Sequence, residues 1–333
     1  MTGPFRRLDG FARYAWLVLA YNVAVVLWGA LVRATGSGAG CGRHWPRCNG
    51  VVVPRSPSAE TLIEFTHRAT SGVALLSVVV LLALAFRRRP AGHPARRGAL
   101  WAMALMLVEA ALGAGLVLLE LVGANTSGAR AMMTGLHLAN TFLLLGALTL
   151  SAWWASGGRA IRFRGQGGAG VWMGTAAAAT LAVGVTGAIT ALGDTLFPRD
   201  AVGLELSGTA HFLERLRIVH PVAAVATGVF LVLAARTIRR LRPDPTTARL
   251  TTVLSALVGT QIAAGALNVA MLAPVWMQLV HLLLADALWI TLVLTAASAL
   301  AVPATDADEG TIGGRRSMEQ TTVESRGGIR PCG

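Results

Sequence analysis

The sequence predicts an all-α integral membrane protein with eight transmembrane helices, and three observations support this prediction. First, 54% of the 333 residues are hydrophobic and only 14% are charged, whereas a soluble domain is about one-quarter charged. Second, the apolar residues occur in blocks of about 20, the length that an α-helix needs to cross a bilayer. Third, arginines concentrate in alternate segments between these blocks, as expected for a chain that crosses a membrane repeatedly. Together these observations exclude a soluble fold.

Eight apolar blocks define the expected helices. The first block is too long, and too poor in small residues at its end, for a cleaved signal peptide. Every even-numbered block contains a histidine, and the third and seventh blocks each contain a polar residue near their middle. We expect transmembrane helices at residues 14–33, 62–86, 97–120, 131–154, 170–192, 211–234, 250–272 and 275–298.

The positive charge indicates membrane topology rather than nucleic-acid binding. The net charge is +13, and all 29 basic residues are arginines. When the loops are assigned alternately to two sides, 20 arginines fall on the side of the N-terminus, six on the opposite side and three inside helix starts. The positive-inside rule then places both termini in the cytoplasm, as an even number of helices requires.

The chain shows signs of an internal duplication. EAALGAGLVLLELVG, from Glu109, resembles QIAAGALNVAMLAP, from Gln261, and each places a glycine four residues later on the same helix face. A weaker similarity links GALVRATG, from Gly29, to GAITALGD, from Gly187. We therefore expect two four-helix bundles of the same topology, related by an axis along the membrane normal. The expected parts are an N-terminal half (1–155), a cytoplasmic linker (156–169), a C-terminal half (170–300) and a disordered cytoplasmic tail (301–333).

Four of the seven histidines lie inside apolar blocks at similar depth, two in each half. Polar side chains inside a bilayer are costly and usually functional. An interhelical hydrogen bond explains a single such histidine equally well, but it explains four at one depth poorly. Paired histidines on facing helices suit the axial ligation of haem, whereas zinc usually needs further Cys or carboxylate ligands, of which Glu64 could supply one. We predict that the haem ligands are His67, His137, His220 and His281.

Arginines lie beside the histidines in both halves. Arg68 follows His67, and two arginines precede His220. A guanidinium group suits carboxylates such as the haem propionates, and the alternative is that these side chains snorkel to the membrane interface. The propionate candidates are Arg33, Arg68, Arg215 and Arg217.

Glu64 lies three residues before His67, so the two side chains share a helix face. A carboxylate beside a haem ligand could act as a base or stabilise a cation that develops at the porphyrin edge. The alternative is a charge near a helix N-terminus, favoured by the helix dipole. No acid has the same spacing from His220, since Glu214 is six residues away. The halves are therefore chemically unequal, and one could hold a substrate haem while the other holds a permanent one.

Cys41 and Cys48 lie seven residues apart in the first outer loop, RATGSGAGCGRHWPRCNGVVVP. This loop faces an oxidising compartment, where a disulfide can persist. Three interpretations stay open: a structural disulfide, a redox-active pair that passes electrons outward, and Cu or Zn binding together with His44.

Other polar residues receive simpler interpretations. Glu109 and Asp286 are expected to form interhelical hydrogen bonds, with a proton path as the alternative. His211 begins the sixth block at the membrane interface.

The segment GALVRATGSGAGCGRHWPRC, followed by EFTHR, HLANTFLLL, RIVHP and WMQLVHLLLADALWI, resembles the haem A synthases. The similarity extends over nearly the whole chain up to about residue 300. The cysteine loop and the four spaced histidines are specific in combination, and the cysteine pair matches the bacterial form of this family.

The resemblance implies that the C8 methyl group of haem O is oxidised to the formyl group of haem A, through hydroxylated intermediates with oxygen from water. It implies a haem B cofactor on His220 and His281, and a haem O substrate between His67 and His137 beside Glu64. The second-half motif reads His-Pro rather than His-Arg, so propionate pairing by a following arginine does not carry over to that half.

The resemblance also implies a setting and partners. We expect a bacterial plasma membrane, whose lipid hydrocarbon suits the farnesyl tail of haem O. The expected partners are an electron acceptor, haem O synthase and cytochrome oxidase assembly factors, and no nucleic acid.

Two other functions would use the same features. A bis-His dihaem cytochrome b, which carries electrons between quinol and a partner, needs the four histidines but has no need of Glu64. A duplicated-repeat transporter would contain no haem and would show no Soret absorption band. The haems extracted from the protein discriminate among the three.

Overall fold

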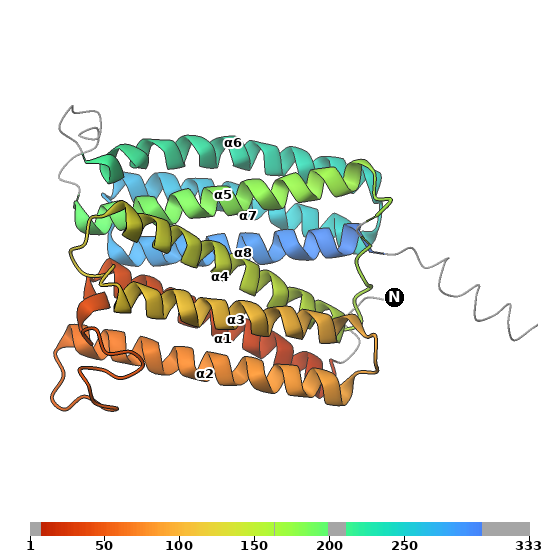
Figure 1. The fold of residues 1–333 in the computed structure, drawn as a ribbon. Helices are drawn as coiled ribbons and strands as arrows, with labels where there is room; N and C mark the ends of the chain where they lie inside the picture. Colours follow the sequence, from red (N-terminus) through yellow and green to blue (C-terminus); the bar gives the residue numbers. More distant parts are fainter. Residues whose placement is uncertain (1–7, 163, 199–210, 302–333) are drawn as a thin grey trace, which may run out of the picture.

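The structure, a computed structural model, describes residues 8–162, 164–198 and 211–301 (Figure 1). Over these residues the chain forms eight helices that are long and apolar enough to cross a membrane, and its only β-pairing is two isolated bridges. The chain is therefore an all-helical, multi-pass membrane protein, as the sequence predicts. The helices are α1 (Gly10–Ala34), α2 (Ala59–Arg88), α3 (Pro94–Leu118), α4 (Gly128–Ala155), α5 (Gly168–Leu196), α6 (Phe212–Leu241), α7 (Pro245–Ala270) and α8 (Val275–Ala299), with a short 3₁₀ turn, η1 (Ser37–Ala39), after α1.

Most helices begin a few residues before the apolar block that predicts them, because polar caps lie outside the apolar run. The side chains of Ser58 and Ser127 accept hydrogen bonds from backbone N–H groups in the first turns of α2 and α4. Asp244 does the same for α7, whose first residue is Pro245. Such caps satisfy donors that the helix leaves free, and proline at the first position loses no hydrogen bond. The predicted disordered tail lies, from residue 302 onward, outside the described residues.

Each half of the chain forms a closed ring of four helices. α1 packs on α2, α2 on α3, α3 on α4 and α4 back on α1, and α5 to α8 contact one another in the same cyclic order. The two rings meet where α1 and α4 pack against α5 and α8 (Figure 1). This arrangement agrees with the expected pair of four-helix bundles, while the duplication itself stays a prediction.

The seam between the rings is held by aromatic packing. The rings of Phe142 on α4 and Trp289 on α8 stack with their centroids 5.4 Å apart. The indole N–H of Trp289 donates to the Phe142 carbonyl at 2.5 Å. Stacked aromatic pairs stabilise beyond the area that they bury, so this contact ties the two halves together beside the cavity described below.

The bundle has two distinct ends. One end carries residues 35–58, between α1 and α2, and we call it the loop end; the other, which we call the terminal end, carries the start of α1 and the end of α8 (Figure 1). At the terminal end Asp9 caps α1 and pairs with Arg89 at 2.8 Å. Desolvation alone would raise the pKa of Asp9, but hydrogen bonds from the Ala12 amide and the Arg89 guanidinium outweigh it and lower the pKa.

Candidate functional site

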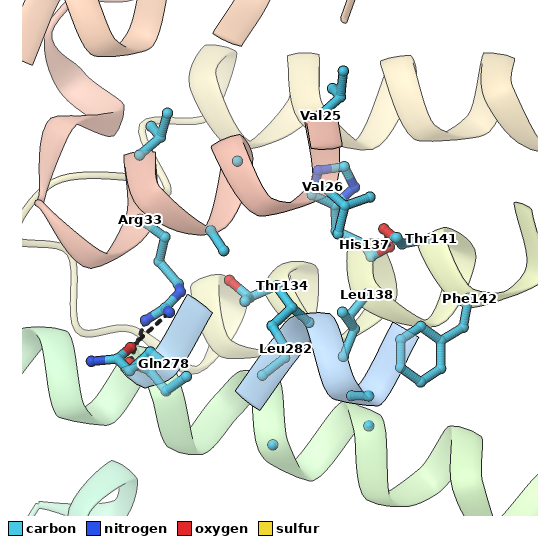
Figure 2. A pocket seen from close by; sticks show the side chains of 18 of the residues that line it. Val25, Val26, Arg33, Thr134, His137, Leu138, Thr141, Phe142, Gln278 and Leu282 are labelled. Atoms are coloured by element: carbon cyan, nitrogen blue, oxygen red, sulfur yellow. Dashed lines mark hydrogen bonds between the residues drawn. The ribbon is translucent and has the colours of Figure 1, made fainter. Parts of the chain in front are cut away.

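One large cavity lies inside the bundle and reaches into both halves. Its volume is about 1100 Å³, and side chains from all eight helices line it. This exceeds the ~300–1,000 Å³ typical of a small-molecule site. Figure 2 shows part of the wall, to which α1, α4 and α8 contribute Val26, His137 and Leu282. All four predicted haem ligands line this cavity: His67, His137, His220 and His281.

The four histidines enter the cavity at one level. They lie six to nine residues after the first residues of α2, α4, α6 and α8, which all begin at the loop end. At ~1.5 Å per residue this is roughly 9–14 Å into the bundle. The predicted common depth is thus confirmed, at about two helical turns.

Each histidine ring packs against a glycine of the preceding helix. Where the glycine lacks a Cβ, the ring of the next helix occupies the space, and in three of the four pairs an added Cβ would come closer than 3.4 Å to the ring. The distances from an ideal Cβ to the nearest ring atom are 2.9 Å for Gly29–His67, 3.9 Å for Gly113–His137, 2.9 Å for Gly187–His220 and 3.1 Å for Gly265–His281. The glycines that suggest a duplication in the sequence therefore lie at equivalent places beside the four histidines.

The second-half pair has the spacing of two axial ligands. The ring centroids of His220 and His281 are 6.5 Å apart and their planes are nearly perpendicular, at 88°. Two imidazoles on opposite sides of one metal ion, with bonds of about 2.0 Å, have ring centres roughly 6 Å apart. Thr186 Oγ1 lies 3.1 Å from His220 Nδ1, which leaves Nε2 for a ligand. The Gln261 amide lies 3.3 Å from His281 Nε2, and Nδ1 of that ring is buried with no hydrogen-bond partner in the described chain. These residues fit a haem iron.

The first-half pair differs in what surrounds it. Nδ1 of His67 is buried without a hydrogen-bond partner among the described residues. Nδ1 of His137 lies 3.3 Å from Glu109 Oε1 on α3, a close electrostatic contact that is too long for an ideal hydrogen bond. Glu109 also accepts hydrogen bonds from the side chains of Asn140, at 2.6 Å, and Thr141. The predicted interhelical role of Glu109 is therefore confirmed.

Glu64 is 3% exposed and lines the cavity close to His67. Its carboxylate accepts hydrogen bonds from the backbone N–H of Cys41, at 2.7 Å, and from the guanidinium of Arg68, one helical turn later. Arg68 also donates to the carbonyls of His44 and Arg47. Both oxygens of Glu64 thus have fixed partners, and the remaining lone pairs are those available to a ligand or a water.

The loop that holds Glu64 is closed by a disulfide between Cys41 and Cys48. Both cysteines are fully buried, whereas His44 is exposed. Residues of the same loop, Trp45 and Pro46, line the cavity. In the part of the chain that the structure describes, no group of three or more His, Cys, Asp and Glu side chains could hold a metal ion. The disulfide occupies both thiols, so in this structure neither is available as a metal ligand.

Arginines line the cavity toward the loop end. Arg33 donates to the Ala191 carbonyl at 2.5 Å and to the Gln278 side chain at 2.9 Å, and so bridges α1 to α5 and α8 (Figure 2). Arg217 pairs with Asp194 at 3.0 Å. The structure places these two and Arg68 at the cavity wall, as expected for propionate candidates, whereas the fourth candidate, Arg215, is exposed and does not line it.

Some residues depart from the predictions or were not anticipated. Arg130 lines the cavity, is 5% exposed and donates to backbone carbonyls at residues 123 and 125. Its position one residue before the apolar block predicted at 131–154 could have identified it. Asp286 is fully buried, but neither carboxyl oxygen has a hydrogen-bond partner among the described residues, so its predicted interhelical bond is not found. His211 caps α6 and stacks on Phe197, which gives it a structural role.

Comparison with known proteins identifies relatives. Residues 12–293 match the COX15-CtaA family, described as cytochrome oxidase assembly protein. The chain is 53% identical over 303 residues, 90% of its length, to a protein of Thermus thermophilus named protoheme IX farnesyltransferase, and spans 49% of that protein. It is 39% identical over 106 residues to the heme A synthase of Lysinibacillus sphaericus, which is 31% of this chain and 34% of that protein. It is 41% identical over 93 residues to the heme A synthase of Alkalihalophilus pseudofirmus, 28% and 31% of the two chains.

Proposed function

Because the chain belongs to the COX15-CtaA family of cytochrome oxidase assembly proteins, we propose that it is a haem A synthase. It oxidises the C8 methyl group of haem O to the formyl group of haem A, with the oxygen atom supplied by water. The observation that carries this proposal is the shared cavity. Two histidine pairs line it, and one pair alone has a carboxylate, Glu64, three residues before its first histidine.

The two halves take different roles in this proposal. His220 and His281 would hold haem B, a role that the 6.5 Å between their ring centroids allows, and haem B would supply reversible one-electron chemistry. His67 and His137 hold the haem O substrate. Relatives named heme A synthase support the assignment of substrate and product.

The arginines and the apolar wall of the cavity suit different parts of the substrate. Arg33, Arg130 and Arg217 line the cavity near the loop end, where guanidinium groups suit the carboxylates of the porphyrin. The rest of the wall is mainly aliphatic, which suits the porphyrin and the farnesyl chain. This gives the substrate one orientation, with the carboxylates toward the loop end.

Glu64 is the residue that acts on the reacting group. Oxidation of a methyl group on a conjugated ring develops positive charge, and a fixed carboxylate in a water-poor site stabilises that charge more strongly than water would. The Cys41 amide and Arg68 hold the carboxylate in place, so no reorganisation is needed when the charge appears. The lone pairs not used by these donors can also orient the attacking water.

The name of the Thermus protein favours a second candidate, the transfer of a farnesyl group to protohaem IX. The chain spans about half the length of that protein, so the named activity belongs to a protein about twice as long. Incubation of the purified chain with haem B and farnesyl diphosphate separates the candidates. A farnesylated haem would establish the second function and overturn the first.

The setting follows from the charge pattern. The arginine-rich segments lie at the terminal end, so the positive-inside rule supports a cytoplasmic location for both termini. The loop end then faces outward, where the disulfide persists. The partners that fit are haem O synthase, cytochrome oxidase assembly factors and an electron acceptor.

The test combines haem extraction with one substitution. The purified protein should yield haem B together with haem O, its hydroxylated forms or haem A, whereas a cytochrome b would yield haem B alone and a transporter none. Glu64→Gln should keep the haem B spectrum and lower haem A production at least ~100-fold, the order typical of losing a catalytic electrostatic or acid–base group. Glu60→Gln, an exposed acid one turn earlier on α2, is the control and should behave like wild type. Normal haem A production in Glu64→Gln would refute the assigned role, and loss of haem B would make that role structural.

A further inference from the structure

The partners of the histidines differ between the halves at one equivalent position. Glu109 on α3 and Gln261 on α7 each lie four residues before the glycine that packs on a histidine of the next helix. Glu109 Oε1 is 3.3 Å from Nδ1 of His137, whereas the Gln261 amide is 3.3 Å from Nε2 of His281, so the residue types and the ring nitrogens both differ. An ionisable carboxyl therefore stands in the first half where a neutral amide stands in the second.

The other carboxylates that line the cavity are paired with arginines. Among the described residues, three carboxylates line the cavity: Glu64, Glu109 and Asp194. Glu64 pairs with Arg68 and Asp194 pairs with Arg217, whereas no arginine pairs with Glu109 in the described chain. The partners of Glu109 are two side-chain donors of α4 and the His137 ring. Among the residues described, Glu109 is thus the carboxylate whose charge reaches a ligand of the first half without a neutralising cation.

A carboxylate beside Nδ1 has defined effects on a metal-ligating histidine. It keeps the proton on Nδ1, so that Nε2 is the nitrogen free to coordinate, and it makes the ring a stronger donor. A stronger donor, and a negative charge in a medium of low dielectric, both favour the more oxidised state of the metal. A neutral amide has neither effect to the same degree.

Resting on the proposed function, we infer that Glu109 is a positioning residue that fixes the tautomer of His137 and lowers the reduction potential of the first-half site below that of the second. The difference between Glu109 and Gln261 would set a direction for electron transfer: a haem iron held in the substrate half would be more readily oxidised, and one held in the cofactor half would more readily accept an electron. Glu64 acts on the reacting methyl group, whereas Glu109 acts through the axial ligand.

The reciprocal exchange tests this inference. The purified protein, supplied with added haem B so that both sites can fill, is titrated spectroelectrochemically as wild type, Glu109→Gln and Gln261→Glu. Glu109→Gln should raise the midpoint potential of one haem, and Gln261→Glu should lower that of the other. In each case the ferric-to-ferrous ratio at fixed potential should change at least tenfold, which is ~59 mV for a one-electron couple. Asp286→Asn is the control and should leave both potentials unchanged, because it removes a buried carboxyl that neither lines the cavity nor makes a hydrogen bond to a histidine.

The outcomes separate this inference from the proposed function. Unchanged potentials in both exchange variants, or a shift equally large in Asp286→Asn, would overturn the role of Glu109 while leaving a haem-binding synthase intact. If the Glu109→Gln variant no longer binds haem in its first half, the Gln261→Glu variant alone tests the inference. An unchanged midpoint potential of the second-half haem in that variant would then overturn the inference. If the potentials of the two variants shift in opposite directions as expected but the wild-type protein makes no haem A, the role of Glu109 is supported and the proposed synthase function is refuted.

Discussion

A methyl group added at Gly187 tests whether the glycines exist to admit the histidine rings. The Cβ of Gly187→Ala would lie 2.9 Å from His220 Cε1, whereas ordinary carbon contacts begin near 3.4 Å. The ring or the helix must therefore move by about half an ångström, a strain of the kind that costs ~1–3 kcal/mol when a core is overpacked. The better helix propensity of alanine returns about 1 kcal/mol to the fold, so the protein should still fold.

The strain should appear in haem binding rather than in folding. If the ring leaves the position that suits axial ligation, the affinity for haem B falls by about the strain energy. At ~1.4 kcal/mol per tenfold, ~1–3 kcal/mol corresponds to roughly 5- to 150-fold weaker binding. The assay is a titration of purified protein with haem B, read from the Soret band and from haem content per chain.

Two glycines serve as controls for Gly187→Ala. Gly174 lies on the same helix with nothing within 4 Å of an added Cβ, and Gly113 would contact its histidine at an ordinary 3.9 Å. Alanine at either position should leave the affinity of the second-half site unchanged. Alanine at Gly29, which would meet His67 at 2.9 Å, should spare haem B and impair the first half. Wild-type haem B affinity in Gly187→Ala would refute the reasoning, since the ring could then not be held by that contact.

Three further predictions follow from the contacts above. Replacing His220 or His281 by Ala should remove the low-spin haem B spectrum, and an unchanged spectrum in both variants would refute their assignment as ligands. Cys41 and Cys48 should react with a membrane-impermeant maleimide in intact cells only after reduction; labelling without reductant argues against the disulfide, and labelling only after lysis argues against the orientation. The lowered pKa of Asp9 means that its ionised form stabilises the fold above the unfolded value near ~3.9 and that this contribution disappears as pH falls through the folded pKa. The difference in Tm between wild type and Asp9→Asn in detergent should therefore shrink below about pH 4, and a difference that stays constant with pH would contradict this.

The sequence predicts the helices and the histidine level well because both depend on local signals. A bilayer demands long apolar runs, and the distance from a helix start sets the depth of a side chain. The ion pair of Glu64 with Arg68 was open to prediction as well, since residues four apart on a helix are neighbours. The loop atoms that cover this ion pair could not be predicted, because the contact of the Cys41 amide with Glu64 depends on how a glycine-rich loop folds back over α2.

Contacts between helices depend on register, which one sequence does not determine. Glu109 contacts His137 because α3 and α4 pack at one particular relative offset. An interhelical hydrogen bond for Asp286 was equally reasonable from the sequence, but none is found in the described chain. Arg215 and Arg217 are two residues apart, so they point to different sides of α6, and only Arg217 reaches the cavity. Hydropathy alone does not say which side that is.

The two halves share the arrangement of glycines packed against histidines, and they differ in the charged side chains near those histidines. Counted back from its histidine, Glu64 of the first half corresponds to Arg217 of the second, because each lies three residues before the ligand and lines the cavity. Each is neutralised by an ion-pair partner, Arg68 and Asp194 respectively, so the bundle tolerates opposite charges in equivalent places. A duplicated bundle with two identical sites would bind two equivalent haems, and neither haem would be favoured as the acceptor of electrons from the other. In the proposed function the glycine–histidine arrangement serves haem binding, and the unequal side chains around it set the difference between the half that reacts and the half that accepts electrons.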